Sequence, residues 1–282
     1  MKNISVIGAG LMGSQIAFAS ALAGYNVTLN DIDDQRLTGG FNALLKQVNK
    51  YVEKGLLSEK QLQQAVEHIS LDSSIENAVA KADLVIEAIV EDVDKKRALF
   101  AQLDTLTPAH TIFATNSSMI VSSMLADHTN RASQVCNLHF FNPVLIMGVV
   151  EVVQGEHTSD DTAQKAIDYV KQIGKIPLHL QKEIPGFIAN RILGKVMEEA
   201  IYLLEQGIAT VEEIDLACTK ALNYPIGPFA LMDMTGLDTA YAVQQTKFEL
   251  EQGGKEPSPL LKEMLELGKL GRKSGEGFYT YR

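Results

Sequence analysis

A histidine and a glutamate twelve residues apart are the pair in this sequence best suited to proton chemistry. His139 ends one apolar run, and Glu151 lies inside the next, with two valines on each side. Burying a carboxylate among valines costs free energy unless it is paired, and an imidazole on a neighbouring element is the natural partner. Such a carboxylate orients the ring and stabilises its charged form, so that the histidine can take or give a proton near neutral pH. From spacing alone, a hydrogen-bonded core histidine and an edge-strand glutamate explain the pattern equally well.

Three glycines near the beginning of the chain have the spacing G-x-G-x-x-G. They follow a predicted strand, Ile4–Ile7, and open a helical pattern. In this context glycines permit a tight turn and a close approach of the backbone to a pyrophosphate, which binds the N–H groups at the start of the helix. The alternative is a glycine turn in a fold that binds no nucleotide. The predicted cofactor-binding residues of this turn are Gly8, Gly10, Leu11, Met12 and Gly13.

An acidic residue, Asp31, lies 18 residues after Gly13, at the end of the second predicted strand. In dinucleotide-binding folds a carboxylate about 20 residues after the glycine motif accepts the ribose hydroxyl. The same carboxylate would repel a 2′-phosphate, and Arg36, five residues further on, is not an obvious phosphate clamp. These features predict NAD rather than NADP as the cofactor.

Strand patterns and helix patterns alternate up to about residue 184, and these elements must position the residues named above. Short β-branched runs are followed by helical stretches such as Asp92–Leu106 and Asp160–Ile173. This order predicts βαβ units and an α/β fold, a Rossmann-type mostly parallel sheet with helices on both faces, over residues 1–184. The predicted strands are Ile4–Ile7, Asn26–Leu29, Leu84–Ala88, Thr111–Ala114, Gln134–His139, Val149–Val153 and Ile176–Leu180.

One stretch of this domain, Asp33–His68, is too long and too polar for a simple crossover. Gly55 lies near its middle, and Ser58 follows in a position suited to the N-cap of a helix. We therefore predict an inserted helical hairpin, with its break near Gly55.

The pattern changes after Pro185-Gly186, where strand signals give way to long helical periods. Gly207 is expected to close the first helix, and Thr210 with Glu213 forms a capping box for the second. We predict an all-α domain over residues 185–282, apolar enough to bury one face against a second copy. The predicted helices are Phe187–Gln206, Val211–Leu222, Leu237–Gln252 and Ser258–Leu267.

Charge and cysteine content exclude several classes of protein. The chain has 282 residues, with 25 Lys and Arg against 35 Asp and Glu, a net charge of −10. Nucleic-acid and membrane-surface binders are normally basic, so neither partner is expected. The two cysteines form no C-x-x-C pair, and no ligand spacing indicates a metal site. Because neither a signal peptide nor an apolar stretch of about 20 residues is present, we expect a soluble, cytoplasmic protein.

Several motifs occur in order from the first strand to the last residues. They are Gly8–Gly13, His139–Pro143, Glu151 between its valines, Pro185–Arg191, Gly227–Phe229 and Gly275–Tyr279. Together they resemble the short-chain L-3-hydroxyacyl-CoA dehydrogenases along the whole chain. The resemblance implies a helical second domain that dimerises. It also implies reversible hydride transfer between C3 of a 3-hydroxyacyl-CoA and C4 of nicotinamide, with acetoacetyl-CoA and 3-hydroxybutyryl-CoA as the substrate pair.

The resemblance assigns catalytic roles to four residues. His139 matches the family's acid–base and Glu151 its partner, while Asn190 matches an asparagine of the catalytic site. The serine that contacts substrate lies 21 residues before the histidine in the family. That spacing selects Ser118 here, with Ser117 as the alternative.

Further contacts are implied elsewhere in the chain. Glu91 and Lys96 match cofactor contacts, and Lys273 matches another one near the C-terminus. Asn142, three residues after the histidine, is expected to contact the substrate.

A basic stripe in the predicted hairpin is the candidate site for coenzyme A phosphates. Lys46, Lys50 and Lys54 recur every four residues and so share one helix face. The stripe falls where the family binds the adenosine phosphate end, and Lys50 and Lys54 are the predicted substrate contacts. Because Glu53 and Glu59 lie close by in sequence, a solvated lysine face is the alternative interpretation.

Two other functions stay open at this point. A dehydrogenase of a free hydroxy acid such as carnitine or gulonate would share the fold and the His139–Glu151 pair, and a catalytically silent protein would keep only the NAD site. The lysine stripe and the length of 282 residues favour the thioester. The presence of Ser118, His139, Glu151 and Asn190 together favours an enzyme. Met119 and Gly148 depart from the family pattern, which has a serine at the first position and often a lysine at the second.

Overall fold

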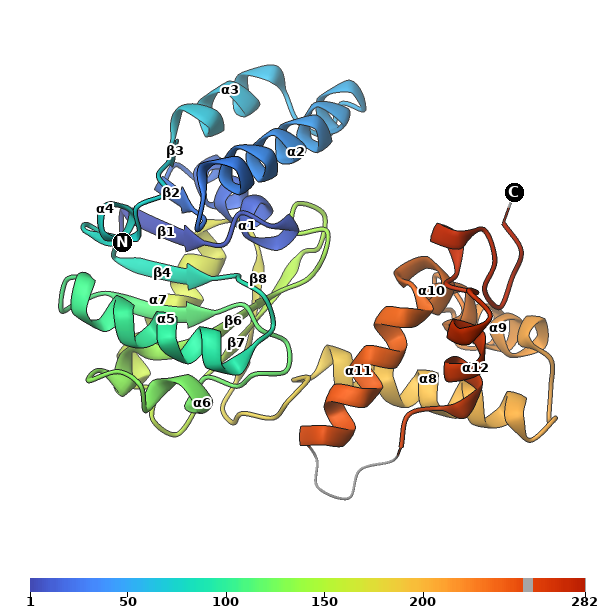
Figure 1. The fold of residues 1–282 in the computed structure, drawn as a ribbon. Helices are drawn as coiled ribbons and strands as arrows, with labels where there is room; N and C mark the ends of the chain where they lie inside the picture. Colours follow the sequence, from blue (N-terminus) through green and yellow to red (C-terminus); the bar gives the residue numbers. More distant parts are fainter. Residues whose placement is uncertain (251–255, 282) are drawn as a thin grey trace. The chain divides into compact units, whose positions relative to one another are not determined.

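The computed structural model describes residues 1–250 and 256–281, and Figure 1 shows its fold. The chain divides into two compact units, Met1–Pro185 and Gly186–Arg282. The first is α/β and the second, in its described residues, is helical, as predicted. The last two residues of the predicted helix Leu237–Gln252 lie outside the described part. Among the described helices, none is both long and apolar enough to cross a membrane.

The first unit is built on a sheet whose eight strands all lie within residues 1–185, in the order β3-β2-β1-β4-β5-β6-β7-β8. The strands are β1 (Asn3–Ile7), β2 (Asn26–Asn30), β3 (Ile69–Leu71), β4 (Leu84–Glu87), β5 (Ile112–Thr115), β6 (Val135–Phe140), β7 (Val149–Val153) and β8 (Ile176–Leu180). Neighbouring strands run parallel, except that β6 and β7 pair antiparallel. The seven predicted strands are confirmed to within one residue at each end. The edge strand β3 lies outside the predicted set because three residues are too few to show a period.

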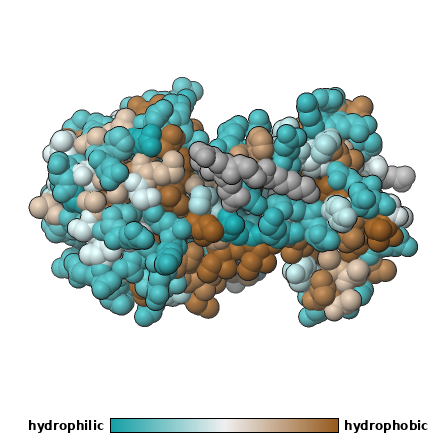
Figure 2. Space-filling model, turned by 90° about the horizontal axis from the view of Figure 1, so that it is seen from below, coloured by the Kyte–Doolittle hydropathy of each residue, from teal (hydrophilic) through white to brown (hydrophobic). Residues whose placement is uncertain are grey.

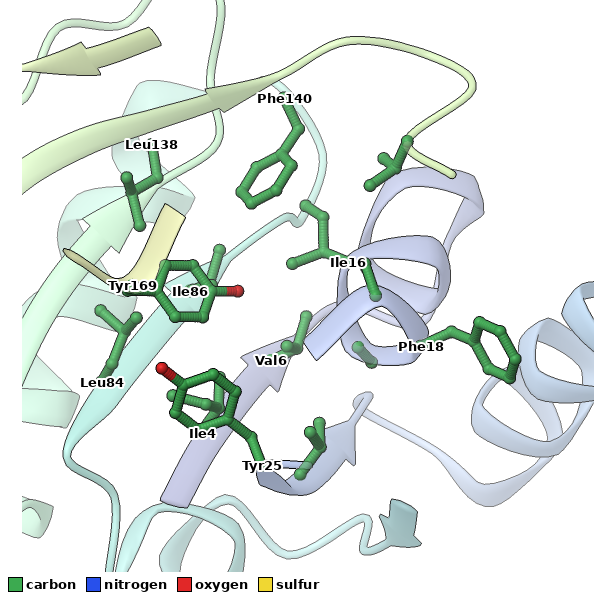
Figure 3. Packing of buried hydrophobic residues seen from close by; sticks show 14 of the residues in the cluster. Ile4, Val6, Ile16, Phe18, Tyr25, Leu84, Ile86, Leu138, Phe140 and Tyr169 are labelled. Atoms are coloured by element: carbon green, nitrogen blue, oxygen red, sulfur yellow. The ribbon is translucent and has the colours of Figure 1, made fainter. Parts of the chain in front are cut away.

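Helices cover both faces of this sheet, because successive residues of a strand point to opposite faces. The helices of the first unit are α1 (Leu11–Leu22), α2 (Asp34–Glu53), α3 (Glu59–Glu67), α4 (Ile75–Val79), α5 (Val93–Leu106), α6 (Ser123–Ala126) and α7 (Asp160–Gln172), with a 3-10 turn at Ala132–Gln134. Ile4 and Val6 of β1 pack in one core with α1 and α7. Ile7 packs in a second core with α5 and α6. Figure 3 shows part of the first core, where Ile16 of α1 and Tyr169 of α7 lie close to the side chains of the strands.

The predicted helical hairpin is formed by α2 and α3. Gly55 lies in the break with a φ of +69°, and Ser58 caps α3 through a reciprocal capping box with Gln61. The hairpin contacts the glycine turn directly, because a Cβ on Gly40 of α2 would lie 1.8 Å from the carbonyl oxygen of Ala9. The inserted segment therefore belongs to the wall of the expected cofactor site.

The helices of the second unit, in its described residues, begin and end close to the predicted positions. They are α8 (Ala189–Glu205), α9 (Val211–Lys220), α10 (Pro228–Thr235), α11 (Leu237–Leu250) and α12 (Pro259–Glu266), with a 3-10 turn at Arg272–Ser274. The capping box of Thr210 and Glu213 is confirmed, and Gly207 follows α8 with a φ of +64°. The helix α10 lies outside the predicted set, because its eight residues show little amphipathic period.

Two buried aspartates organise the second unit. Asp215 accepts hydrogen bonds from two backbone N–H groups at the start of α10 and from the hydroxyl of Tyr279. Asp233 accepts them from the N–H groups of Phe278 and Tyr279 and from the hydroxyl of Tyr281. A carboxylate that accepts several hydrogen bonds offsets part of its cost of burial.

Glycines of two sequence motifs lie directly against these aspartates. A Cβ on Gly227 would lie 2.2 Å from Cγ of Asp215, and a Cβ on Gly277 would lie 2.0 Å from Oδ1 of Asp233. No side chain fits at either position unless a neighbour moves. The motifs Gly227–Phe229 and Gly275–Tyr279 thus have an architectural role within the second unit.

Candidate active site

His139 and Glu151 lie directly opposite each other on β6 and β7. Nδ1 of the histidine is 2.6 Å from Oε2 of the glutamate, and the two residues are 5% and 0% exposed. The antiparallel register places both side chains on the same face of the sheet. Since Nδ1 faces the carboxylate, Nε2 is the ring nitrogen through which His139 can exchange a proton. The structure therefore brings the predicted pair together in the geometry of a general acid–base.

The segment that carries Ser118 follows β5, the parallel neighbour of β6. Asn116 ties this segment to β6, because its side-chain oxygen accepts the N–H of Phe140 at 3.0 Å. Ser117 is buried, accepts the N–H of Ile120 and donates its hydroxyl to Glu91. Ser118 is half-buried, and within the described residues its hydroxyl has no hydrogen-bond partner. Of the two candidate serines, Ser118 is thus the one whose hydroxyl is not committed to the fold.

The loop after His139 is held by two side chains that the sequence did not single out. Gln15 of α1 is buried, accepts the N–H of Val144 at 2.8 Å and approaches Oδ1 of Asn142 at 3.5 Å. The ammonium of Lys175 donates to the carbonyls of Val144 and Met147 at 2.6 and 2.7 Å. Burial lowers the pKa of Lys175, and these two carbonyls compensate part of that cost. Asn142 itself is exposed.

The glycine turn lies between β1 and α1, beside the point where the strand order reverses between β1 and β4. Dinucleotides bind at such a switch point, at the carboxyl ends of the strands. Gly8 has a φ of +104°, and a Cβ on Gly13 would lie 1.8 Å from the oxygen of Gly8, so the turn itself needs both glycines. A Cβ on Gly10 would meet nothing within 4 Å.

Among the described residues, none fills the space beside Gly10 at the N-terminus of α1, and no side chain of theirs caps this helix. Leu11 is 60% exposed beside it, and Met12 is half-buried. Backbone N–H groups that no side chain satisfies are the donors that a pyrophosphate needs. These residues fit a dinucleotide.

Asp31 stands at the end of β2, next to this turn. Its Oδ2 accepts the N–H of Ala9 at 2.7 Å, and its Oδ1 accepts the N–H of Ile32 at 2.8 Å. Each carboxylate oxygen retains a second lone pair, so the residue can also accept ribose hydroxyls. Arg36 forms an ion pair with Asp33 at 3.4 Å on the surface.

Glu91 and Lys96 differ strongly in exposure. The side chain of Lys96 is 1% exposed and that of Glu91 is 42% exposed, and the two form an ion pair at 3.4 Å. Lys96 also contacts Glu87, a fully buried residue at the end of β4, at 2.5 Å. Sequence reasoning missed Glu87, although a glutamate ending the apolar run from Leu84 is the same signal that identified Glu151.

The remaining predicted residues are placed as follows. Asn190 is half-buried in the first turn of α8, in the second unit. Lys273 of the same unit donates to both carboxylate oxygens of Asp238 at 2.6 Å, and its ammonium holds the pKa of Asp238 below its ordinary value. Lys50 and Lys54 are exposed on the hairpin, as is Lys46, and among the described residues none of the three forms an ion pair.

The two departures from the family pattern have different surroundings. Met119 is buried, and its N–H lies 3.4 Å from Glu91. Gly148 is exposed, and a Cβ there would meet nothing within 4 Å, so a side chain would have room at this position. Within residues 1–250 and 256–281, no three His, Cys, Asp or Glu side chains are grouped to hold a metal ion.

A doubly wound sheet, an open glycine turn at its switch point, an acid at the end of β2 and a buried His–Glu pair define a nicotinamide-dependent dehydrogenase. Family comparison makes the class specific. Residues 3–184 match the NAD-binding domain of 3-hydroxyacyl-CoA dehydrogenase, and residues 186–281 match its C-terminal domain. The chain belongs to the 3-hydroxyacyl-CoA dehydrogenase family.

Individual relatives match along more than nine-tenths of their length. A probable 3-hydroxybutyryl-CoA dehydrogenase of Bacillus subtilis is 39% identical over 282 residues, covering 100% of this chain and 98% of the relative. The mitochondrial hydroxyacyl-coenzyme A dehydrogenase of Homo sapiens is 38% identical, covering 100% and 92%. The crystal structure of (S)-3-hydroxybutyryl-CoA dehydrogenase from Ralstonia eutropha superposes with a TM-score of 0.92 at 38% identity, covering 100% and 99%.

Proposed function

We propose that this enzyme interconverts short-chain 3-hydroxyacyl-CoA and 3-oxoacyl-CoA thioesters, with 3-hydroxybutyryl-CoA and acetoacetyl-CoA as the substrate pair and NAD as the cofactor. The observation that carries the proposal is the buried contact between His139 and Glu151, next to the Ser118 segment and in a sheet whose glycine turn fits a dinucleotide. Family membership and the names of the relatives support the thioester over a free hydroxy acid.

The acid–base work falls to Nε2 of His139. In the oxidising direction it accepts the proton of the 3-hydroxyl group, and Glu151 stabilises the charged ring that results. In the reducing direction the charged ring donates this proton to the developing alkoxide. Ser118 would donate a hydrogen bond to the substrate oxygen, and Asn190 would contact the thioester region. Bound nicotinamide supplies the hydride chemistry, while the protein supplies position and proton transfer.

Direct assay tests this proposal. The enzyme should oxidise NADH when acetoacetyl-CoA is added, and the initial rate should be compared with those for NADPH, for longer 3-oxoacyl-CoA chains and for free acetoacetate. We expect the highest kcat/KM with NADH and acetoacetyl-CoA. Turnover of acetoacetate as fast as of its thioester would contradict the proposed substrate class.

The preference for NAD rests on Asp31, whose carboxylate would face a 2′-phosphate. Two like charges in contact disfavour binding. Arg36, the nearest cation in sequence, is already paired with Asp33. Asp31→Ala should therefore raise the Kd for NADH and bring it closer to the Kd for NADPH. An unchanged ratio of the two Kd values would contradict this assignment.

The lysine stripe is proposed to bind the phosphates of coenzyme A. Its lysines are exposed and form no ion pair among the described residues, so they supply local positive charge on a chain whose net charge is −10. The double substitution Lys50→Glu and Lys54→Glu should raise the KM for acetoacetyl-CoA about tenfold or more, since each site changes from attraction to repulsion. Lys165→Glu on α7, another exposed helix lysine, is the control. Equal effects of both changes would contradict the assignment.

We also propose that the chain forms a homodimer through its second unit. Ile192 of α8 is 61% exposed and lines a groove of about 780 Å³ formed largely by apolar residues of α8 and α9, and Leu216 of α9 is 56% exposed. The face shown in Figure 2 is mostly hydrophilic, with a broad patch of hydrophobic residues. Sedimentation should find a dimer, and Ile192→Glu should shift it toward monomer. A parental protein that sediments as a monomer would contradict the proposal.

The proposed compartment is the cytoplasm. Cys136 is buried and Cys218 half-buried, and both are free thiols, as expected where thiols stay reduced. Fractionation of cells producing the tagged protein tests this assignment, which recovery outside the cytoplasmic fraction would contradict.

A further inference from the structure

Glu87 is a buried carboxylate to which no role in the reaction has yet been given. It is 0% exposed at the end of β4, beside the glycine turn, since a Cβ on Gly8 would lie 2.5 Å from the oxygen of Ala88. Its oxygens accept three hydrogen bonds, from the ammonium of Lys96, the N–H of Ile89 and the hydroxyl of Thr115. The donors come from three segments: α5, the chain after β4 and the end of β5.

The hydrogen bond from Lys96 connects Glu87 to the expected cofactor residues. The ammonium of Lys96 lies 2.5 Å from Glu87 and 3.4 Å from Glu91. The other carboxylate oxygen of Glu91 accepts the hydroxyl of Ser117. Lys96 thus stands between two carboxylates, and the inner one fixes how far the ammonium can move toward the outer one.

The hydrogen bond from Thr115 connects Glu87 to the segment that carries Ser118. The hydroxyl of Thr115 donates to Oε2 of Glu87 at 2.6 Å and accepts the N–H of Ser117 at 3.1 Å. This arrangement sets the direction in which the chain leaves β5, three residues before Ser118. A change at Glu87 therefore reaches the cofactor side first through Lys96 and the substrate side first through Thr115, and both paths end at Ser117.

We propose that Glu87 is a positioning residue for the dehydrogenase reaction. Through Lys96 it fixes the ammonium and Glu91 on the cofactor side, and through Thr115 it fixes the Ser118 segment on the substrate side. The inference rests on the proposed function, because Lys96, Glu91 and Ser118 are the contacts assigned there. Glu87 itself is 0% exposed, so it acts through these neighbours.

The chemistry of the site calls for a carboxylate at this position. All three neighbours of Glu87 are donors, and an ionised carboxylate is a pure acceptor with room for all of them. The amide of Glu87→Gln would turn an N–H₂ group toward at least one donor and would remove the charge opposite Lys96. The ammonium would then be left with Glu91 alone and should shift toward it, away from its position in the parental enzyme.

A matched control separates positioning from stability. Asp104 and Arg131 form another largely buried ion pair in the first unit, at 2.7 Å, where Asp104 lies near the end of α5 remote from Lys96. Asp104→Asn and Glu87→Gln should both lower the Tm. Only Glu87→Gln should raise the Kd for NADH about tenfold and lower the kcat with acetoacetyl-CoA about tenfold, because it removes the charged contact with Lys96.

Two further variants test the Thr115 contact and the Lys96 contact of Glu87 separately. They also replace Glu87→Gln as the test if that variant does not fold. Thr115→Val should lower kcat severalfold and leave the Kd for NADH within about twofold of the parental value. Lys96→Met should raise that Kd, and adding Glu87→Gln to it should raise the Kd by less than about twofold more, because the two changes act through one contact.

The inference is overturned if Glu87→Gln lowers only the Tm, as Asp104→Asn does, or, where it does not fold, if Thr115→Val leaves kcat unchanged. NADH binding is measured by fluorescence without any acyl-CoA, so the outcome is distinct from that of the proposed function. A parental enzyme that binds NADH but does not reduce acetoacetyl-CoA would contradict the proposed function and leave the Kd comparison intact.

Discussion

Both units bury carboxylates, but they surround them with different partners. In the first unit, Glu151 lies against His139, at the carboxyl end of β6. In the second unit, Asp215 and Asp233 accept hydrogen bonds from backbone N–H groups and from tyrosine hydroxyls. Burial costs are of the same kind in both places, so the partners decide what each carboxylate can do.

A histidine can gain or lose a proton in the range where enzymes work, whereas a backbone N–H cannot. The tyrosine hydroxyls that contact the aspartates also keep their protons in this range. Burial, helped by the neighbouring Asp215, raises the pKa of Tyr279, so its hydroxyl stays a neutral donor. The pair in the first unit can therefore take part in a reaction, while the aspartates of the second unit hold loops to helices.

The largest effect is expected from replacing the histidine that lies against Glu151. His139→Gln keeps a polar side chain of similar size but cannot carry a proton, so kcat with acetoacetyl-CoA should fall about 10³-fold. The Kd for NADH should change little, because the histidine is not assigned to the cofactor. Steady-state kinetics together with fluorescence titration check this prediction. A kcat equal to the parental value in this variant would contradict the claim that the His139–Glu151 pair takes part in the reaction.

Two glycine substitutions sharpen the comparison. Gly10→Ala adds a methyl group where the protein leaves space, so it should weaken NADH binding about tenfold or more with the Tm unchanged. Gly277→Ala places a methyl group 2.0 Å from Asp233 and should lower the Tm, with the Kd for NADH unchanged in protein that remains folded. Differential scanning fluorimetry and NADH titration measure both. The reverse pattern would show that the open space at Gly10 is not for a ligand.

Asp233→Asn tests whether the second unit's carboxylate is purely structural. The amide group would oppose one of its three donors, so the free energy of unfolding should fall by about 2–3 kcal/mol. Below the unfolding transition, kcat should stay close to the parental value. Urea unfolding and an activity assay at low temperature give the two numbers. A large loss of kcat in fully folded protein would mean that this region, too, acts on the reaction.

The smallest effect concerns an ion pair of the first unit with no place in the reaction. Burial alone would raise the pKa of Asp104, but hydrogen bonds from Asn130 and Arg131 outweigh it and hold the pKa below its ordinary value. A carboxylate of this kind adds stability above its unfolded-state pKa of about 3.9, and the contribution is lost as the pH falls through the native pKa. The stability difference between the parental enzyme and Asp104→Asn should be constant near neutral pH and shrink below about pH 4. Urea titrations of both proteins at several pH values measure this stability difference. A difference that stays constant below about pH 4 would contradict the prediction.

Local patterns in the sequence predicted seven of the eight strands of the first unit and indicated His139 and Glu151 as a candidate pair. Glu151 is conspicuous because it interrupts a run of valines, and its partner could be inferred because the preceding apolar run ends in a histidine. The break of the hairpin at Gly55 and the cap at Ser58 were predicted from single residues with a strong local preference.

What the sequence did not reveal depends on contacts between distant segments. Gln15 holds the loop after His139 across a separation of 129 residues to Val144, and nothing in its local sequence indicates that. Lys96 looks like an ordinary helix lysine, yet the fold buries it against Glu87. The strand β3 and the helix α10 are too short to show a period and are held by their neighbours.

The central claim is that His139 and Glu151 act as one acid–base unit. Single-turnover hydride transfer from NADH to acetoacetyl-CoA, measured for His139→Gln, Glu151→Gln and the double variant, tests it most directly. If the two residues act as a unit, the double variant should be no slower than His139→Gln alone, because the carboxylate has no other role in the step. Rate losses that multiply in the double variant would contradict the claim.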